Sequence, residues 1–261
     1  MVFDDAFRKQ LLNKSKAYIN YTVFDKKGKI DDVFWSAETF VNASTAPFYK
    51  ISSQLSSAFV KQDLTAQNRG GLLTQGAYLA AHAPKAATGI IRRGHSISED
   101  YLCKPIPPPP QNVQPANPTA MLPAKFTQRM RQELIHTSNA SCNACHQHID
   151  PGGVMFENFD AAGIYQSTDG GLPVDAKMTL INAGDTSGSF DNAADFFKKT
   201  SSSQRVGECY VNRLFEFQSG QAPTEAKSCM AAKLYDNFKK SDRNFAETWI
   251  SLFSDKSIFT R

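Results

Sequence analysis

Apolar residues recur at the spacing of an α-helix through most of the chain. In residues 4–24 the apolar side chains fall roughly on one face, and residues 69–83 repeat this pattern. Residues 123–138 continue it, with Pro123 suited to the first turn of a helix. Four further helices are predicted towards the C-terminus, over residues 192–200, 204–220, 224–240 and 244–255. The pattern therefore predicts a mainly α fold.

Two stretches interrupt the helical pattern. Residues 105–118 are rich in proline, which removes the amide donor and fixes φ, so we expect an extended strap there. Residues 163–189 are rich in glycine, aspartate and threonine, which indicates loop with at most short strands. These breaks predict an N-terminal helical module, the strap, a middle module that includes the loop-rich segment, and a C-terminal helical module, over residues 1–104, 105–118, 119–190 and 191–261.

Charge and hydropathy exclude two classes of protein. The formal net charge is +4 and no run of basic residues exceeds two, so the electrostatic footprint of a nucleic-acid-binding protein is missing. No stretch approaches 18 apolar residues, and the first residues lack the apolar region of a signal peptide. We therefore expect no transmembrane segment and no nucleic-acid partner.

The strongest chemical signal is the segment Cys142-Asn-Ala-Cys145-His146 in the middle module. In a chain with five cysteines and five histidines, the expected number of chance Cys-x-x-Cys-His matches is roughly 0.002. Three readings compete: a covalently attached haem c, a zinc site that uses Cys142, Cys145, His146 and His148, and a thioredoxin-like redox pair.

Covalent haem explains the spacing best. The two thiols must add to the two vinyl groups of haem while the next residue places its imidazole under the iron, and one short helical turn does all three. A zinc site needs four ligands in a tetrahedral array, but His146 and His148 are two residues apart and point away from each other on a helix. A redox pair usually follows a strand in a βαβ unit, which this pattern lacks.

Several long motifs resemble a known family. The segments RGGLLTQGAYLAAHA, RRGHSISEDYLCKPIPPPPQNV, HTSNASCNACHQHIDPGGVMFENFDAAGIY and CYVNRLFEFQSG resemble, in this order, the C-terminal modules of the large planctomycete-type cytochrome c family of uncharacterised exported proteins. The resemblance implies helical modules around one covalent haem c and a periplasmic or extracellular location, with an export signal outside the printed chain. The family usually has arginine where Gln166 stands and a Gly-Arg pair around Gln221.

The axial ligands of the haem follow in part from the motif. His146 is the proximal ligand, because the two thioether bonds fix its position. For the sixth ligand we predict His136, six residues before Cys142, with Met178, Met155 or an open sixth position as alternatives. The other reading of His136 is a cap for the last carbonyls of its helix, and that of each methionine is ordinary packing.

Residues near the motif carry further expectations. A carbonyl or carboxylate near Asp150 and Pro151 can accept the Nδ1 proton of His146, although Asp-Pro-Gly-Gly is also strong turn chemistry. Glu157 and Asp160 are expected to cap the following backbone rather than to bind a cation. Arg93, with its neighbour Arg92, can pair with haem propionates, but a solvated basic turn is the default reading.

Three cysteines lie outside the motif. Export favours oxidation, so Cys209 and Cys229, on neighbouring predicted helices, are expected to form a disulfide, with Cys103 left single. Chain spacing alone leaves Cys103 open as a partner.

The leading functional hypothesis is a monohaem c-type module that transfers single electrons to a redox partner protein. One alternative is a haem enzyme with an open distal site that acts on peroxide or serves a dehydrogenase. Another is a structural or binding module in which the metal site only stabilises the fold.

Overall fold

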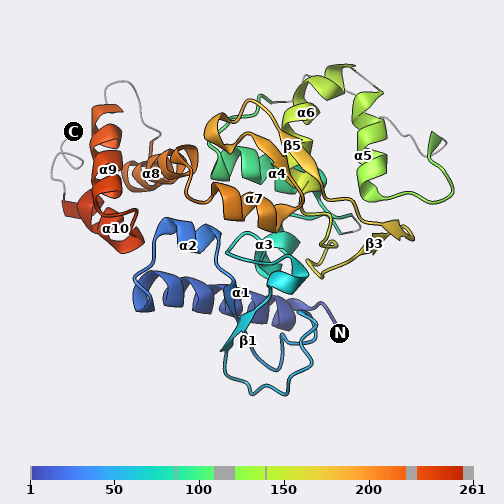
Figure 1. Cartoon of the computed structure of the whole chain (residues 1–261), viewed down its shortest axis with the longest axis horizontal. Helices are drawn as coiled ribbons and strands as arrows, with labels where there is room; N and C mark the ends of the chain where they lie inside the picture. The colour runs from blue at the N-terminus through green and yellow to red at the C-terminus, as the bar shows by residue number, and fades with distance from the viewer. Residues whose placement is uncertain (1, 86, 109–120, 139, 222–227, 255–261) are drawn as a thin grey trace.

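The computed structural model describes residues 2–85, 87–108, 121–138, 140–221 and 228–254. In these residues the chain forms ten α-helices and three two-stranded antiparallel hairpins (Figure 1). The predicted mainly α fold is confirmed. Residues 109–118 of the predicted proline-rich strap lie outside the described residues. No helix in the described part of the chain is long and apolar enough to cross a membrane.

The N-terminal region is a helical layer with a hairpin beside it. Helix α1 (Asp5–Asn20) begins where the Asp4 side chain accepts a hydrogen bond from the amide of Phe7, and it continues into a π-helical turn. A short helix α2 (Ile30–Phe34) follows. The hairpin of β1 (Glu38–Val41) and β2 (Val60–Asp63) was not predicted. Helix α3 (Gly76–Ala81) covers only the second half of the predicted helix over residues 69–83.

The middle of the molecule is built on two crossed helices, α4 (Ile90–Ser96) and α6 (Ala140–Val154). The sequence suggested a turn at Asp-Pro-Gly-Gly, but α6 continues through Pro151, Gly152 and Gly153. A Cβ on Gly153 would overlap the carbonyl oxygen of Ile90, and one on Gly94 would overlap that of Ile149. The glycines therefore serve close helix packing instead of a turn.

Replacing Gly153 by alanine tests this close approach. We expect Gly153→Ala to lower the free energy of unfolding by about 2 kcal/mol, because the backbones of α4 and α6 must separate to admit the methyl group. The adjacent Gly152→Ala is the matched control, since its Cβ would lie 3.3 Å from the nearest atoms of Gly94. Urea unfolding followed by circular dichroism gives both values, and equal stability of the two variants would contradict the crossing as described.

Helix α5 and strand β5 pack against α6. Helix α5 (Gln128–Thr137) begins at Thr127, whose hydroxyl accepts from the amide of Met130, so Pro123 lies outside the helix. The strands of the loop-rich segment are short, as predicted: β3 (Thr168–Asp169) with β4 (Leu172–Pro173), and β5 (Met178–Leu180) with β6 (Gly188–Phe190). A 3₁₀ turn over Gly184–Thr186 lies between β5 and β6.

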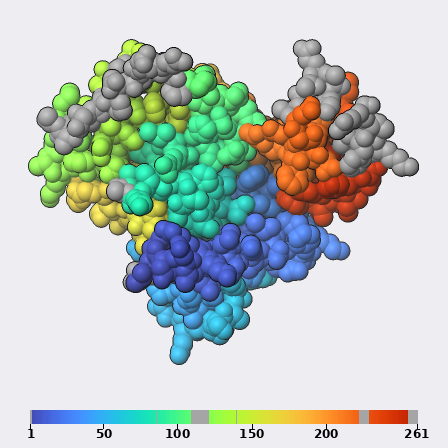
Figure 2. Space-filling model, turned by 180° about the vertical axis from the view of Figure 1, so that it is seen from behind, coloured from blue at the N-terminus to red at the C-terminus, as the bar shows by residue number. Residues whose placement is uncertain are grey.

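The C-terminal helices follow the predicted pattern closely. They are α7 (Ala193–Thr200), α8 (Gln204–Ser219), α9 (Ser228–Lys240) and α10 (Phe245–Ser254). Helices α8 to α10 lie at the opposite end of the molecule from α5 and α6, in both views (Figures 1 and 2). A long distance therefore separates the Cys-x-x-Cys-His helix from the C-terminal helices.

Three apolar cores hold these elements together. The central core joins α3, α4, the end of α6, β5, β6 and α7. A second core joins residues 23–33, which include part of α2, to α8, α9 and α10, so the N-terminal and C-terminal regions share a core. A third lies under α1 and the first hairpin. The predicted module boundaries stay predictions, since two of the three cores include residues from more than one predicted module.

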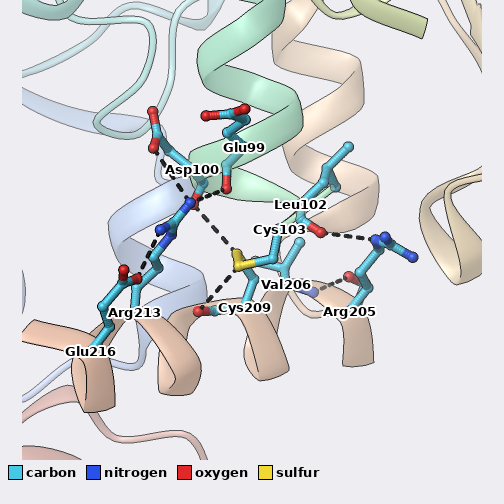
Figure 3. The surroundings of a disulfide bond; sticks show 10 residues. Glu99, Asp100, Leu102, Cys103, Arg205, Val206, Cys209, Arg213 and Glu216 are labelled. Atoms are coloured by element: carbon cyan, nitrogen blue, oxygen red, sulfur yellow. Dashed lines mark hydrogen bonds and ion pairs between the residues drawn. A yellow bond between two sulfur atoms is a disulfide. The ribbon is translucent and has the colours of Figure 1, made fainter. Parts of the chain in front are cut away.

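The disulfide prediction was wrong. Cys103 is joined to Cys209, with Cα atoms 5.3 Å apart (Figure 3). Cys229 is free and exposed. Cys209 is only 2% exposed and faces the segment after α4, whereas Cys229 lies in the first turn of α9 and is exposed. Beside the bond, Arg213 donates to the carbonyl of Glu99 at 2.8 Å and Arg205 to that of Leu102 at 2.9 Å. One side of α8 is thus joined to residues 99–103 by three contacts, the disulfide and the hydrogen bonds of the two arginines.

Candidate haem-attachment site

Helix α6 presents the Cys-x-x-Cys-His residues near its N-terminal end. Cys142 and Cys145 are separated by one helical turn, and His146 follows directly. Both cysteines are free thiols with partly exposed side chains, and His146 is partly exposed as well. The helix therefore offers two thiols and an imidazole on a partly exposed surface.

Asp150 holds the ring of His146. The Nδ1 atom of His146 lies 3.0 Å from Oδ1 of Asp150, one turn further along α6. Burial acts to raise the pKa of Asp150, but the hydrogen bonds to His136 and His146 outweigh it and hold the pKa below its usual value. A carboxylate that accepts from Nδ1 fixes the tautomer in which Nε2 is free to bind a metal. The predicted acceptor for His146 is confirmed, and it is the carboxylate.

His136 shares the same carboxylate. It lies in the last turn of α5, is 5% exposed, and its Nδ1 contacts the second oxygen of Asp150. The rings of His136 and His146 are stacked, with centroids 3.5 Å apart and planes 17° apart. The structure thus brings His136 to the site from a different helix, but places it against the ring of His146.

A hollow of about 200 Å³ adjoins these residues. It lies between α5, α6 and β5 and is lined by His136, His146, Asp150, Arg129, Lys177 and Met178, among others. Met178 therefore lies beside the histidines, although it also packs in the central core. Met155 is fully buried in that core, which favours the packing reading for it.

The zinc ligands of the alternative reading do not come together. Among the described residues, one group of three potential metal ligands lies within 4.8 Å, and it consists of His136, His146 and Asp150. Neither cysteine belongs to it. Both Nδ1 atoms contact the carboxylate oxygens directly, so a metal ion bound between them would have to replace these hydrogen bonds.

The sequence-based expectation for Arg93, which packs next to α6, differs from its position in the structure. Arg93 is fully buried, and its guanidinium donates to the carbonyls of Phe159, Asp160 and Leu79 at 2.9, 2.7 and 3.2 Å. The expectation of a solvated basic turn at Arg93 was wrong. Arg93 instead joins α4 to the loop after α6 through these hydrogen bonds. A local sequence pattern does not predict hydrogen bonds between residues so far apart in the chain.

The two acidic residues after α6 differ in role. Asp160 accepts from the amides of Ala162 and Ile164, as the capping prediction stated. Glu157 is 2% exposed, and neither of its carboxylate oxygens has a hydrogen-bond partner within the described part of the chain. Burial raises the pKa of Glu157 to about 7, although the Thr88 hydroxyl and the Arg93 guanidinium offset part of the effect. The capping prediction for Glu157 was wrong.

Comparison with known proteins supports the resemblance seen in the sequence for part of the chain. Residues 69–169 match the family described as PSCyt3, protein of unknown function (DUF1588), a planctomycete cytochrome c-type family. The matched region is less than half of the chain, and it includes the Cys-x-x-Cys-His helix, His136 and Asp150. No curated protein and no solved structure matches the chain.

Proposed function

We propose that this chain is a monohaem c-type cytochrome module that transfers single electrons within an exported protein. The main support for the proposal is the hydrogen bond between Nδ1 of His146 and the carboxylate of Asp150, together with the two free thiols that precede His146 on the same helix. This donor set fits a covalently bound haem c. Cys142 and Cys145 would form the thioether bonds and His146 would supply the proximal nitrogen.

The chemistry that the haem supplies when bound is a reversible change between Fe(III) and Fe(II). The chain's own residues hold and orient the proximal imidazole through Asp150. Two cationic side chains line the hollow beside His146, but Arg129 is ion-paired with Glu133 and Asp175, and Lys177 with Asp191, so either would have to exchange partners to bind a carboxylate group of a ligand.

The sixth ligand has two candidates at the site. His136, predicted from the sequence, is stacked on His146, so it would have to leave this stack if it were to bind the same iron from the other side of the haem group. Met178 lines the hollow beside His146. The role of His136 as a metal ligand stays a prediction.

Location and partner belong to the same proposal. The Cys103–Cys209 disulfide supports an oxidising compartment, because such bonds are rare in the cytosol. We therefore place the protein in the periplasm or outside the cell, with a redox protein as its electron partner.

Covalent haem attachment is the test of the proposed function. The chain is produced with a haem c maturation system, and its denatured mass is expected to exceed the sequence mass by one haem. Cys142→Ser/Cys145→Ser should lose this mass, while Cys229→Ser should keep it, because Cys229 belongs to α9, which lies at the opposite end of the molecule from α6 (Figure 1). A mature preparation without added mass, or with zinc alone, would refute the proposal.

A further inference from the structure

We propose that His136 and Asp150 act together on the proximal side, where they set how strongly His146 donates electrons to iron. In this role His136 is a positioning residue. The inference rests on the proposed function and goes beyond it, because it assigns the control of the reduction potential to a pair of residues that bind no metal themselves.

The geometry of the two imidazoles carries the first step. Each Nδ1 faces one oxygen of the same carboxylate, and the rings are stacked 3.5 Å apart. Because Nε2 lies across the ring from Nδ1, both Nε2 atoms point away from Asp150, roughly in the same direction. Two axial ligands must instead point at each other from opposite faces of a haem. The stacked pair therefore places His136 beside the proximal ligand.

Hydrogen bonding to one carboxylate carries the second step. An anionic acceptor at Nδ1 makes a histidine a stronger electron donor, which stabilises Fe(III) and lowers the reduction potential. In this site the carboxylate is shared, because the N–H of His136 binds the second oxygen of Asp150. His136 thus draws part of the negative charge of Asp150 away from His146.

Burial of His136 makes this sharing stable. Its side chain is 7% exposed and that of Asp150 is 17% exposed, so water competes weakly for either group. The two residues come from α5 and α6, so the contact also fixes the packing of these helices.

The signs of the expected effects are opposite for the two residues. Asp150→Asn removes the anionic acceptor and should raise the potential. We expect at least a tenfold shift in the ratio of reduced to oxidised protein at a fixed potential, which corresponds to about 59 mV for one electron. His136→Ala returns the full charge of Asp150 to His146 and should lower the potential. His136→Gln keeps an N–H donor and should restore a value close to that of the parent protein.

The experiment uses the haem-loaded chain and these three variants, with His95→Ala as the matched control. His95 is half exposed on α4, where it pairs with Glu99. Denatured mass first establishes that haem is covalent, and potentiometric titration and absorption spectra then follow. Loss of the low-spin spectrum, or new carbon monoxide binding, in both His136 variants would make His136 an axial ligand and overturn the inference. An unchanged potential in Asp150→Asn would overturn it as well.

A measurement without haem separates this inference from the proposed function. In the haem-free chain, imidazole nitrogen NMR should show the Nδ1–H tautomer of His146 and its loss in Asp150→Ala, which leaves no acceptor at Nδ1. If the chain takes up no haem but this signal behaves as expected, the proposed function fails while the hydrogen-bonded pair stands. If the tautomer is the same in the parent and in Asp150→Ala, the pair itself is refuted.

Discussion

Removal of the Cys103–Cys209 disulfide is expected to lower the free energy of unfolding by about 5 kcal/mol. The bond closes a loop across a sequence separation of 106 residues, and cross-linking such distant residues removes much of the entropy of the unfolded chain. The double variant Cys103→Ala/Cys209→Ala should show this loss in denaturant unfolding.

The matched control is Cys229→Ser, which removes the free, exposed cysteine and should change stability by less than about 0.5 kcal/mol. A reducing agent should destabilise the parent protein and Cys229→Ser alike, and leave the double variant unchanged. Peptide mapping that found Cys209 joined to Cys229 would restore the pairing expected from the sequence and contradict the structure.

The stability of the protein is expected to fall as the pH rises from about 5 to about 7.5, because of Glu157. Its pKa is raised by burial from 4.5 to about 7, so the folded state keeps a proton that the unfolded state releases between these values. The contribution of Glu157 to the free energy of unfolding is therefore fully present below pH 4.5, and it is lost as the pH rises through about 7. The full difference corresponds to about 3 kcal/mol.

Glu157→Gln isolates this effect from other titrating groups, among them Asp150, whose lowered pKa acts in the opposite sense. The free energy of unfolding of the parent protein minus that of the variant should fall by about 2 to 3 kcal/mol between pH 5 and pH 8. Charged neighbours of Glu157 are Arg93, Asp169 and Arg129, and all three are retained in the variant. A difference that does not change with pH would show that Glu157 is ionised throughout.

The amphipathic pattern predicted most of the helices because it depends on short-range spacing. Helices α1 and α7 to α10 lie where apolar residues recur at helical intervals, and the strands of the loop-rich segment are short. Errors arose where long-range contacts decide the local structure. Asp-Pro-Gly-Gly has turn chemistry, but α6 continues through it because its glycines allow the backbone of α4 to pass closely.

Part of the candidate site could be predicted from local spacing, and part depends on tertiary packing. Cys142, Cys145, His146 and Asp150 lie within nine residues on one helix, so their relation could be predicted from spacing alone. His136 could be named from the sequence, but its stack on His146 depends on how α5 packs against α6.

Only the tertiary structure decides which residues form contacts with residues that are distant in the chain. Whether Cys209 meets Cys103 or Cys229 depends on which face of α8 is buried. The burial of Arg93 and Glu157 likewise follows from the packing of α4 against the end of α6 and the loop after it. The sequence by itself thus determined the helices and the thiol–imidazole motif, because both follow from neighbours along the chain. The tertiary structure alone decided the disulfide, the buried charges and the place of His136, because each depends on contacts between elements that the local pattern does not specify.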